Sequence, residues 1–296
     1  MRSTMFTTSV RMAEQLAELG FCRVPGAGAW RHNGVSFATE GAWAVLRATA
    51  PATGDPLADL WGQPGPWKAV SGSHLHLAHS RHVRSEDVTP RRFRRVFEVP
   101  LSLLVEGEGD DGGDALDAGR GVSPLGALVA WGLATLEGQC PPGWQTPSRE
   151  EVEARLAPGA LTVQCGAHAR QGQVVADGGR LALRMPILAR RPAGLSECRL
   201  SWLRQVLLDA QDRWRLVRVG PVPDGPESPV EAEVDLTGAP PLLLDGLAAV
   251  AATALRCAVS WVVGPCAFLA HAAREPRALA MCRGSRAPGA SSAAGG

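Results

Sequence analysis

Apolar and polar positions recur with regular periods between residues 148 and 270, and these periods predict a series of helices and strands. Ser148 and Glu151 have the spacing of a capping box, which predicts a short helix that Pro158 and Gly159 close. Three strands are expected next. Alternation marks the half-buried strands among them, at Leu161, Val163 and Cys165 and again at Leu181, Leu183, Met185 and Ile187.

A second helix is predicted from Ser196, which is placed as its N-cap residue between the apolar pair Leu195 and Leu200. Its apolar residues recur at spacings of three and four, which gives one stripe facing the sheet: Leu200, Leu203, Leu207, Ala210 and Trp214. Trp202 and Val206 lie off this stripe. We interpret them as partner-binding residues, and the alternative is that they pack beneath the first half of the chain.

Two further strands are predicted over residues 215–219 and 230–236. The second alternates Val230, Ala232, Val234 and Leu236 with the acidic residues Glu231, Glu233 and Asp235. We expect the acidic row to face Arg180, Arg184 and Arg218 on neighbouring strands, because opposite charges on one sheet face stabilise pairing. This arrangement would stabilise a sheet and would not be a catalytic carboxylate pair.

The last predicted helix begins near Pro241 and contains an apolar stretch, 247–270, that is long enough to span a membrane. Arg256 near its middle would cost about 2.5–3.5 kcal/mol in a bilayer. A narrow polar stripe also follows one side, at Asp245, Ala249, Thr253, Arg256, Ser260 and Gly264. The pattern favours a buried amphipathic helix over a membrane span, with a kink or an end at Gly264 and Pro265.

The N-terminal half predicts a helix over 9–19, a type I′ hairpin at Asn33-Gly34, and strands over 42–47, 67–70, 75–79 and 95–105. Pro100 should place the last of these at an edge or break it. Residues 106–122 combine Gly with acidic residues and cannot bury much surface. We therefore expect an N-terminal α+β domain over 1–105, a linker over 106–122, a C-terminal domain over 123–282 and a disordered tail over 283–296.

The amino-acid composition and net charge make some classes of function less favoured than others. Of the 296 residues, 45% are hydrophobic and 20% are charged, which is typical of a folded globular chain. The net charge of +1 gives no overall field toward nucleic acid or an anionic membrane. The seven Cys residues form no CxxC pair, and the first ten residues hold no apolar signal segment, so we expect a cytoplasmic protein.

The residues that could carry chemistry are few. His74, His76 and His79 have strand spacing and could approach a metal, with Glu86 and Asp87 nearby, but no HExxH arrangement accompanies them. We expect solvated histidines, no metal and no cofactor, and keep a metal-dependent enzyme as the alternative. Gly107, Gly109 and Gly112 match a dinucleotide fingerprint only formally, because acidic neighbours would repel a pyrophosphate.

The element order α-βββ-α-ββ-α over 148–270 resembles the fold of class I type III secretion chaperones and of the related YbjN-like domains. The resemblance rests on LSECRLSWLRQVLLDAQDRWRLVRVG (195–220), VEAEVDLTGAPP (230–241) and the helix that follows. It implies an antiparallel sheet with helices packed on one face, and a dimeric protein that binds a partner segment. The N-terminal half, which also runs from a helix through strands to the apolar residues 125–136, is open to interpretation as a degenerate repeat.

The sequence thus predicts an α+β protein that acts by binding proteins or by self-association. We expect no catalysis, no small-molecule substrate, no nucleic acid and no membrane partner.

Overall fold

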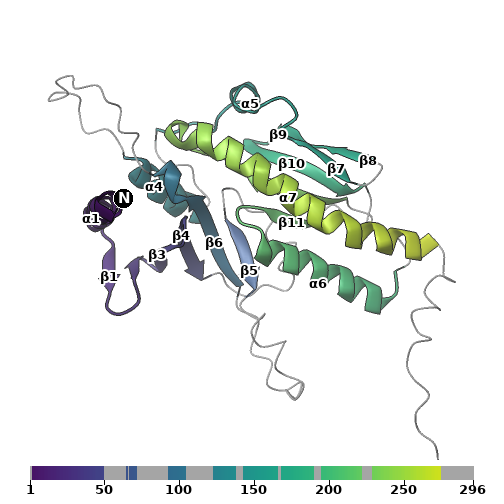
Figure 1. The fold of residues 1–296 in the computed structure, drawn as a ribbon, viewed down its shortest axis with the longest axis horizontal. Coiled ribbons are helices and arrows are strands. Elements are labelled where there is room, and N and C mark those ends of the chain that lie inside the picture. The colour runs from purple at the N-terminus through teal and green to yellow at the C-terminus, as the bar shows by residue number, and fades with distance from the viewer. Residues whose placement is uncertain are drawn as a thin grey trace, which may run out of the picture.

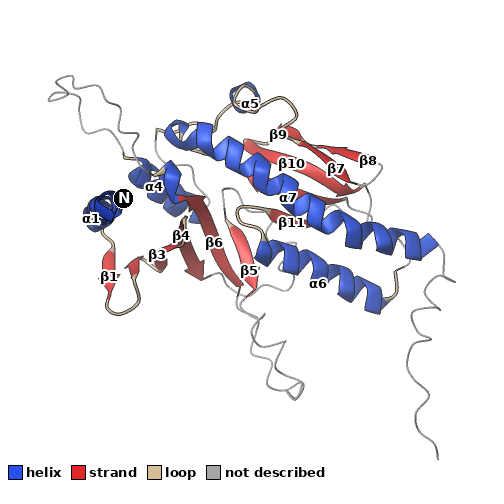
Figure 2. Ribbon diagram, in the orientation of Figure 1, coloured by secondary structure: helices blue, strands red, loops and turns tan. Residues whose placement is uncertain are grey.

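Helices and antiparallel sheets make up the computed structural model, which is therefore α+β as predicted (Figure 1). The structure describes residues 2–49, 65, 67–71, 93–104, 123–137, 143–165, 168–189, 195–221 and 229–274. Within these ranges every strand pair is antiparallel. Figure 2 shows the helices α6 and α7 side by side, next to the strands.

The N-terminal half forms a six-stranded sheet with the order β1-β2-β3-β4-β6-β5. Helix α4 packs on its apolar face, where Trp131 meets the ring of Phe97 edge-on at 5.0 Å. Helix α1 in turn contacts α4. The elements are α1 (Arg2–Glu18), β1 (Cys22–Val24), β2 (Ala29–His32), β3 (Val35–Glu40), β4 (Trp43–Thr49), β5 (Lys68–Ser71), β6 (Phe93–Pro100), the 3₁₀ helix η2 (Leu101–Leu103) and α4 (Pro124–Leu136).

The turn between β2 and β3 confirms the predicted hairpin. Asn33 and Gly34 have φ angles of 43° and 79°, the two positive values that a type I′ turn requires. Pro100 was predicted to place its strand at an edge or to break it, and the second outcome is observed. Strand β6 lies between β4 and β5, so it is not an edge strand, and it ends at Pro100. Proline has no N–H to continue the ladder, and the chain turns there into η2.

The C-terminal half forms a four-stranded sheet with the order β11-β12-β10-β9 and a separate two-stranded sheet of β7 and β8. The capping box predicted at Ser148 and Glu151 is present in both directions. The elements are α5 (Arg149–Glu153), β7 (Thr162–Cys165), β8 (His168–Gln171), β9 (Gln173–Asp177), β10 (Arg180–Leu188), α6 (Glu197–Arg213), β11 (Arg218–Pro221), β12 (Val230–Asp235) and α7 (Pro241–Arg274).

Four strands lie between α5 and α6, where the sequence pattern had given three. Gly172 separates β8, which pairs with β7, from β9, which pairs with β10. The amide of Gly172 donates to the carbonyl of Leu161 at 2.7 Å, and a Cβ atom there would lie 3.0 Å from the carbonyl oxygen of Arg184. A side chain would therefore crowd the neighbouring strand at this break.

Helix α7 covers elements of both halves. It contacts β7, β10 and β12 of the C-terminal half and also α4 and η2 of the N-terminal half. The predicted polar stripe, from Asp245 to Gly264, is its exposed side. The helix does not end at Gly264 and Pro265 but continues to Arg274. Within the described residues it is the one helix long and apolar enough to cross a membrane, yet half of its most apolar window is buried against the fold.

The two halves share one apolar core. Trp131 of α4 is fully buried, and its indole N–H donates at 2.9 Å to the carbonyl of Thr237, two residues after the end of β12. Buried residues of both sheets belong to the same cluster, including Phe37 and Leu46 of the first and Leu183 of the second. The predicted linker, 106–122, and the predicted tail, 283–296, lie outside the described residues, and the predicted domain limits stay a prediction.

Candidate functional site

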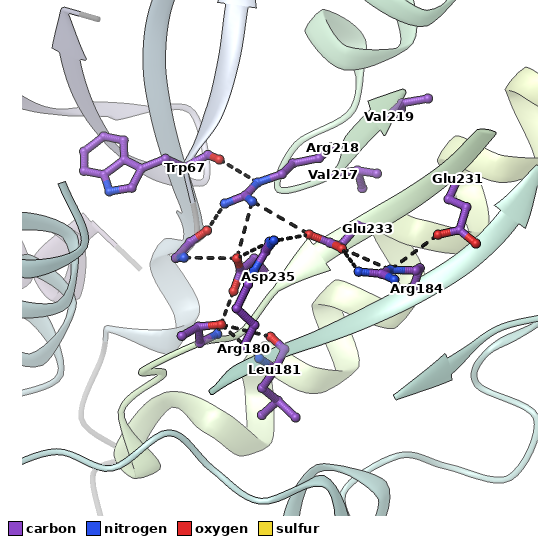
Figure 3. Close-up of polar contacts among 12 residues, drawn as sticks. Trp67, Arg180, Leu181, Arg184, Val217, Arg218, Val219, Glu231, Glu233 and Asp235 are labelled. Atoms are coloured by element: carbon purple, nitrogen blue, oxygen red, sulfur yellow. Dashed lines mark hydrogen bonds and ion pairs between the residues drawn. The ribbon is translucent and has the colours of Figure 1, made fainter. Parts of the chain in front are cut away.

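Six charged residues gather on one face of the four-stranded sheet (Figure 3). Strand alternation sets them apart from the apolar residues that face the core, and the strand register brings them together because Glu233 lies opposite Arg184 on one neighbour and opposite Arg218 on the other. We call this group the charge cluster. Its members are Arg180, Arg184, Arg218, Glu231, Glu233 and Asp235.

The pairs within the charge cluster confirm that the acidic row of β12 faces arginines. Arg184 donates from Nη2 to Glu233 Oε2 at 2.8 Å and lies 3.4 Å from Glu231. Arg180 Nη2 is 3.1 Å from both Glu233 Oε1 and Asp235 Oδ2. One arginine therefore joins two successive carboxylates on the same side of the strand.

Arg218 also reaches the main chain of the N-terminal half. Its Nε donates to the carbonyl of Trp67 at 2.8 Å, and its Nη2 donates to the carbonyl of Gly65. Its Nη1 lies 3.3 Å from Asp235 Oδ2, and the same carboxylate oxygen accepts the amide of Gly65 at 3.0 Å. Two residues of the charge cluster thus hold three main-chain groups of another segment.

The formal charges of the cluster cancel, because it contains three guanidinium groups and three carboxylates. Arg218, Glu233 and Asp235 are at most 1% exposed. Burying such charges costs several kcal/mol per ion, and they stay ionised only when opposite charges and hydrogen bonds compensate. The cluster is therefore a pre-arranged and mutually neutralised set rather than a group of free acids.

Glu231 is the member whose ionisation the fold opposes. Burial raises the pKa of its carboxyl above the usual 4.5, the guanidinium of Arg184 partly offsets this shift, and Glu233 adds to it. An acid with a raised pKa binds its proton more tightly in the folded chain than in the unfolded chain. Its ionisation therefore lowers stability as the pH rises from 4.5 through the raised pKa.

We expect Glu231→Gln to raise the free energy of unfolding at pH 7, with a gain that shrinks as the pH falls toward 4.5. Urea denaturation between pH 4 and 8 measures it. Glu151→Gln is the control of opposite sign, because hydrogen bonds from the backbone and side chain of Ser148 lower the pKa of Glu151. A gain for Glu231→Gln that is equal at all pH values would contradict the assignment.

A second buried group joins β5, β6 and the end of α6. Lys68 Nζ donates to the carbonyls of Trp214 at 2.5 Å and Gln211 at 3.3 Å, and it lies 3.1 Å from Glu98 Oε2. Burial lowers the pKa of Lys68, and the nearby Glu98 partly offsets the effect. Arg215 also pairs with Glu98. A lysine at carbonyls of the C-terminal turn of a helix is stabilised by the helix dipole.

The charge cluster and the group around Lys68 both hold the two halves of the chain together. Their charged atoms face opposite charges or main-chain carbonyls, so these residues position one half of the chain against the other. Among the residues that the structure describes, no three His, Cys, Asp or Glu side chains are grouped to bind a metal. A surface hollow of about 520 Å³ by the β1–β2 turn is lined by Arg23, Val24, Pro25, Gly26 and Gly28.

The metal candidates His74, His76 and His79 lie outside the described residues, together with Glu86, Asp87 and the glycines of the formal dinucleotide match. The hypotheses about metal binding and dinucleotide binding at these residues therefore stay predictions.

The structure separates the two residues predicted to bind a partner. Trp202 is 42% exposed on α6, but Val206 is 8% exposed and belongs to the apolar core. The placement of Val206 off the buried stripe was wrong. Helix α6 packs against β5 and β11 as well as α7, so its buried arc is wider than the sequence stripe indicated. This contact with β5 is the packing under the first half that stood as the alternative.

Sequence reasoning did not find the residues of the N-terminal half that meet these charges, namely Gly65, Trp67, Lys68 and Glu98. A weak signal was present in two of them. Lys68 and Glu98 each interrupt an apolar strand, at Trp67–Val70 and Val96–Val99, and a single charge among buried positions indicates a paired partner. Nothing in the sequence indicates that the main-chain amide and carbonyl of Gly65 bind Asp235 and Arg218.

Comparison of the chain with protein-family models, curated proteins and solved structures finds no match.

Proposed function

We propose that this protein is a non-catalytic, chaperone-like binding module, that it self-associates, and that Trp202 lies at the centre of the contact. One observation carries the proposal: Trp202 is 42% exposed on a helix whose neighbouring apolar residues Leu203 and Leu207 are at most 2% exposed. Large aromatic side chains of this kind supply much of the binding energy at protein interfaces.

The position of Trp202 supports this role. Helix α6 is held by β5, β11 and α7, so it presents Trp202 from a fixed support and little ordering would be needed on binding. The exposed Cys198 and the half-buried Gln205 lie one turn away on the same side of the helix. An apolar ring with polar neighbours suits a surface that must stay soluble when it is unpaired.

The resemblance to class I secretion chaperones and YbjN-like domains also supports binding, because those proteins act as dimers that hold partner segments. The pairing within the charge cluster also supports a non-catalytic role, because its carboxylates form ion pairs with arginines that stabilise the fold. A metal-dependent enzyme using His74, His76 and His79 is the alternative. Stoichiometric zinc in the purified protein, measured by metal analysis, would replace the proposal by that alternative.

We expect Trp202→Ala to weaken self-association at least tenfold, because truncating a central aromatic anchor costs about 2 kcal/mol or more. Sedimentation equilibrium over a range of concentrations measures the dissociation constant. Leu242→Ala is the matched control, because Leu242 is 58% exposed at the start of α7. A monomeric wild-type protein, or equal weakening by both substitutions, would contradict the proposal.

A further inference from the structure

The contacts between the charge cluster and the N-terminal half have the form of peptide recognition. Arg218 donates to the carbonyls of Gly65 and Trp67, and Asp235 accepts the amide of Gly65. All three contacts involve main-chain atoms of residues i and i+2. A planar guanidinium with fixed donors suits two carbonyls in a way that a lysine does not.

The side chains of the held segment are directed elsewhere. The indole N–H of Trp67 donates to Thr135 Oγ1 of α4 at 2.9 Å, and Lys68 extends to the last turn of α6. Gly65 tolerates no side chain. Its φ angle is +91°, and a Cβ atom would lie 2.5 Å from Cβ of Thr135, a branched residue in a rigid helix. The segment is therefore selected by a Gly, an aromatic residue and a Lys.

The groups that hold the segment also contact other residues of the C-terminal half. Asp235 Oδ1 accepts the amide of Thr237 at 2.8 Å, and its other oxygen is 3.1 Å from Arg180. Arg218 is 1% exposed and lies opposite Glu233 on β12. A well-packed apolar pair at such a junction is often as stable as buried charges. The charges instead give directional recognition of a backbone.

We propose that Arg218 and Asp235 form a main-chain clamp for a peptide with the pattern Gly-x-Trp-Lys, and that Gly65, Trp67 and Lys68 of the same chain are its resident occupant. The inference rests on the proposed binding function and names the kind of segment bound. A tethered occupant has an effective concentration in the millimolar range, so it excludes an added peptide from the wild-type protein.

The test uses the full chain and a synthetic peptide of residues 61–69, WGQPGPWKA, labelled with fluorescein at its N-terminus. Gly65→Val removes the fit of the resident segment and leaves Arg218 and Asp235 unchanged. We expect the peptide to bind this variant at least tenfold more tightly than it binds wild type, as measured by fluorescence anisotropy. Adding Arg218→Lys to Gly65→Val should abolish the gain, because a lysine ammonium is a single point charge and does not reproduce the separate Nε and Nη2 donors that meet the two carbonyls.

The matched control peptide is WGQPVPWKA, which carries valine at the position of Gly65 and should not bind. Circular dichroism establishes that each variant is folded, and Gly65→Ala provides a milder displacement if the valine variant is not. Equal anisotropy for wild type and the folded Gly65 variants, or binding that persists with Arg218→Lys, would overturn the clamp.

The clamp and the proposed function fail separately. If Trp202→Ala weakens self-association while the peptide fails to bind, the protein is a binding module in which the Arg218 contact only joins the halves. If the peptide binds while Trp202→Ala has no effect, the clamp stands and the Trp202 contact falls.

Discussion

We expect Arg218→Met to lower the free energy of unfolding by about 3–5 kcal/mol, because removing one partner of a buried ion pair leaves the opposite charge uncompensated. The loss reaches beyond the charges, since the carbonyls of Gly65 and Trp67 lose their donors as well. Urea denaturation followed by circular dichroism at pH 7 measures the change.

Two variants make this measurement specific. Arg256→Met removes an exposed arginine from α7 and should change stability by less than about 0.5 kcal/mol. Arg218→Met combined with Asp235→Asn should be less destabilised than the sum of the two single changes, because the orphaned carboxylate is then neutral. A loss below about 1 kcal/mol for Arg218→Met would show that the charge cluster contributes little to holding the halves together.

The second large effect is expected for Trp131→Ala, which should lower the free energy of unfolding by about 3–5 kcal/mol through the cavity that it leaves in the core. The indole is fully buried, packs edge-on against Phe97, and donates to the carbonyl of Thr237 in the other half. Leu242→Ala is the control, since its side chain is 58% exposed and its loss should cost less than about 0.5 kcal/mol.

The same denaturation curves examine the predicted division into domains over 1–105 and 123–282. If Trp131 and the charge cluster join the halves into one cooperative unit, both variants should shift a single transition seen equally by fluorescence and circular dichroism. Two separate transitions would favour independent domains, and Trp131→Ala would then shift only the transition of residues 123–282, where Trp131 lies.

Local features of the fold were readable from the sequence because each depends on a few adjacent residues. Asn33-Gly34 specifies its turn through two positive φ angles, and Ser148 with Glu151 specifies a helix start through reciprocal hydrogen bonds. The alternation in β12 was sufficient to predict that its acidic side faces arginines, because neighbouring strands share their faces. The exposed stripe of α7 followed from helical periodicity in the same way.

Only part of the candidate site could be predicted from the sequence, because periodicity contains no information about contacts between residues that are far apart in the chain. Arg218 and Gly65 are 153 positions apart, and no spacing rule connects them. Val206 was misplaced for a related reason: a helix in contact with three neighbours buries more than one stripe, and the sequence of α6 does not say that β5 is among them. The need for a glycine at position 172 likewise depends on a residue of another strand, because the carbonyl oxygen of Arg184 leaves little room for a side chain there.

The reach of α7 has a consequence for the order of events during synthesis. Because this helix covers strands of the C-terminal half and also contacts α4 and η2, the earlier elements leave the ribosome with their apolar surface uncovered. The nascent chain therefore has to stay out of aggregates until more than 240 residues have been translated. Final consolidation of the fold is then a late step, and we expect the growing polypeptide to benefit from holding factors during that interval.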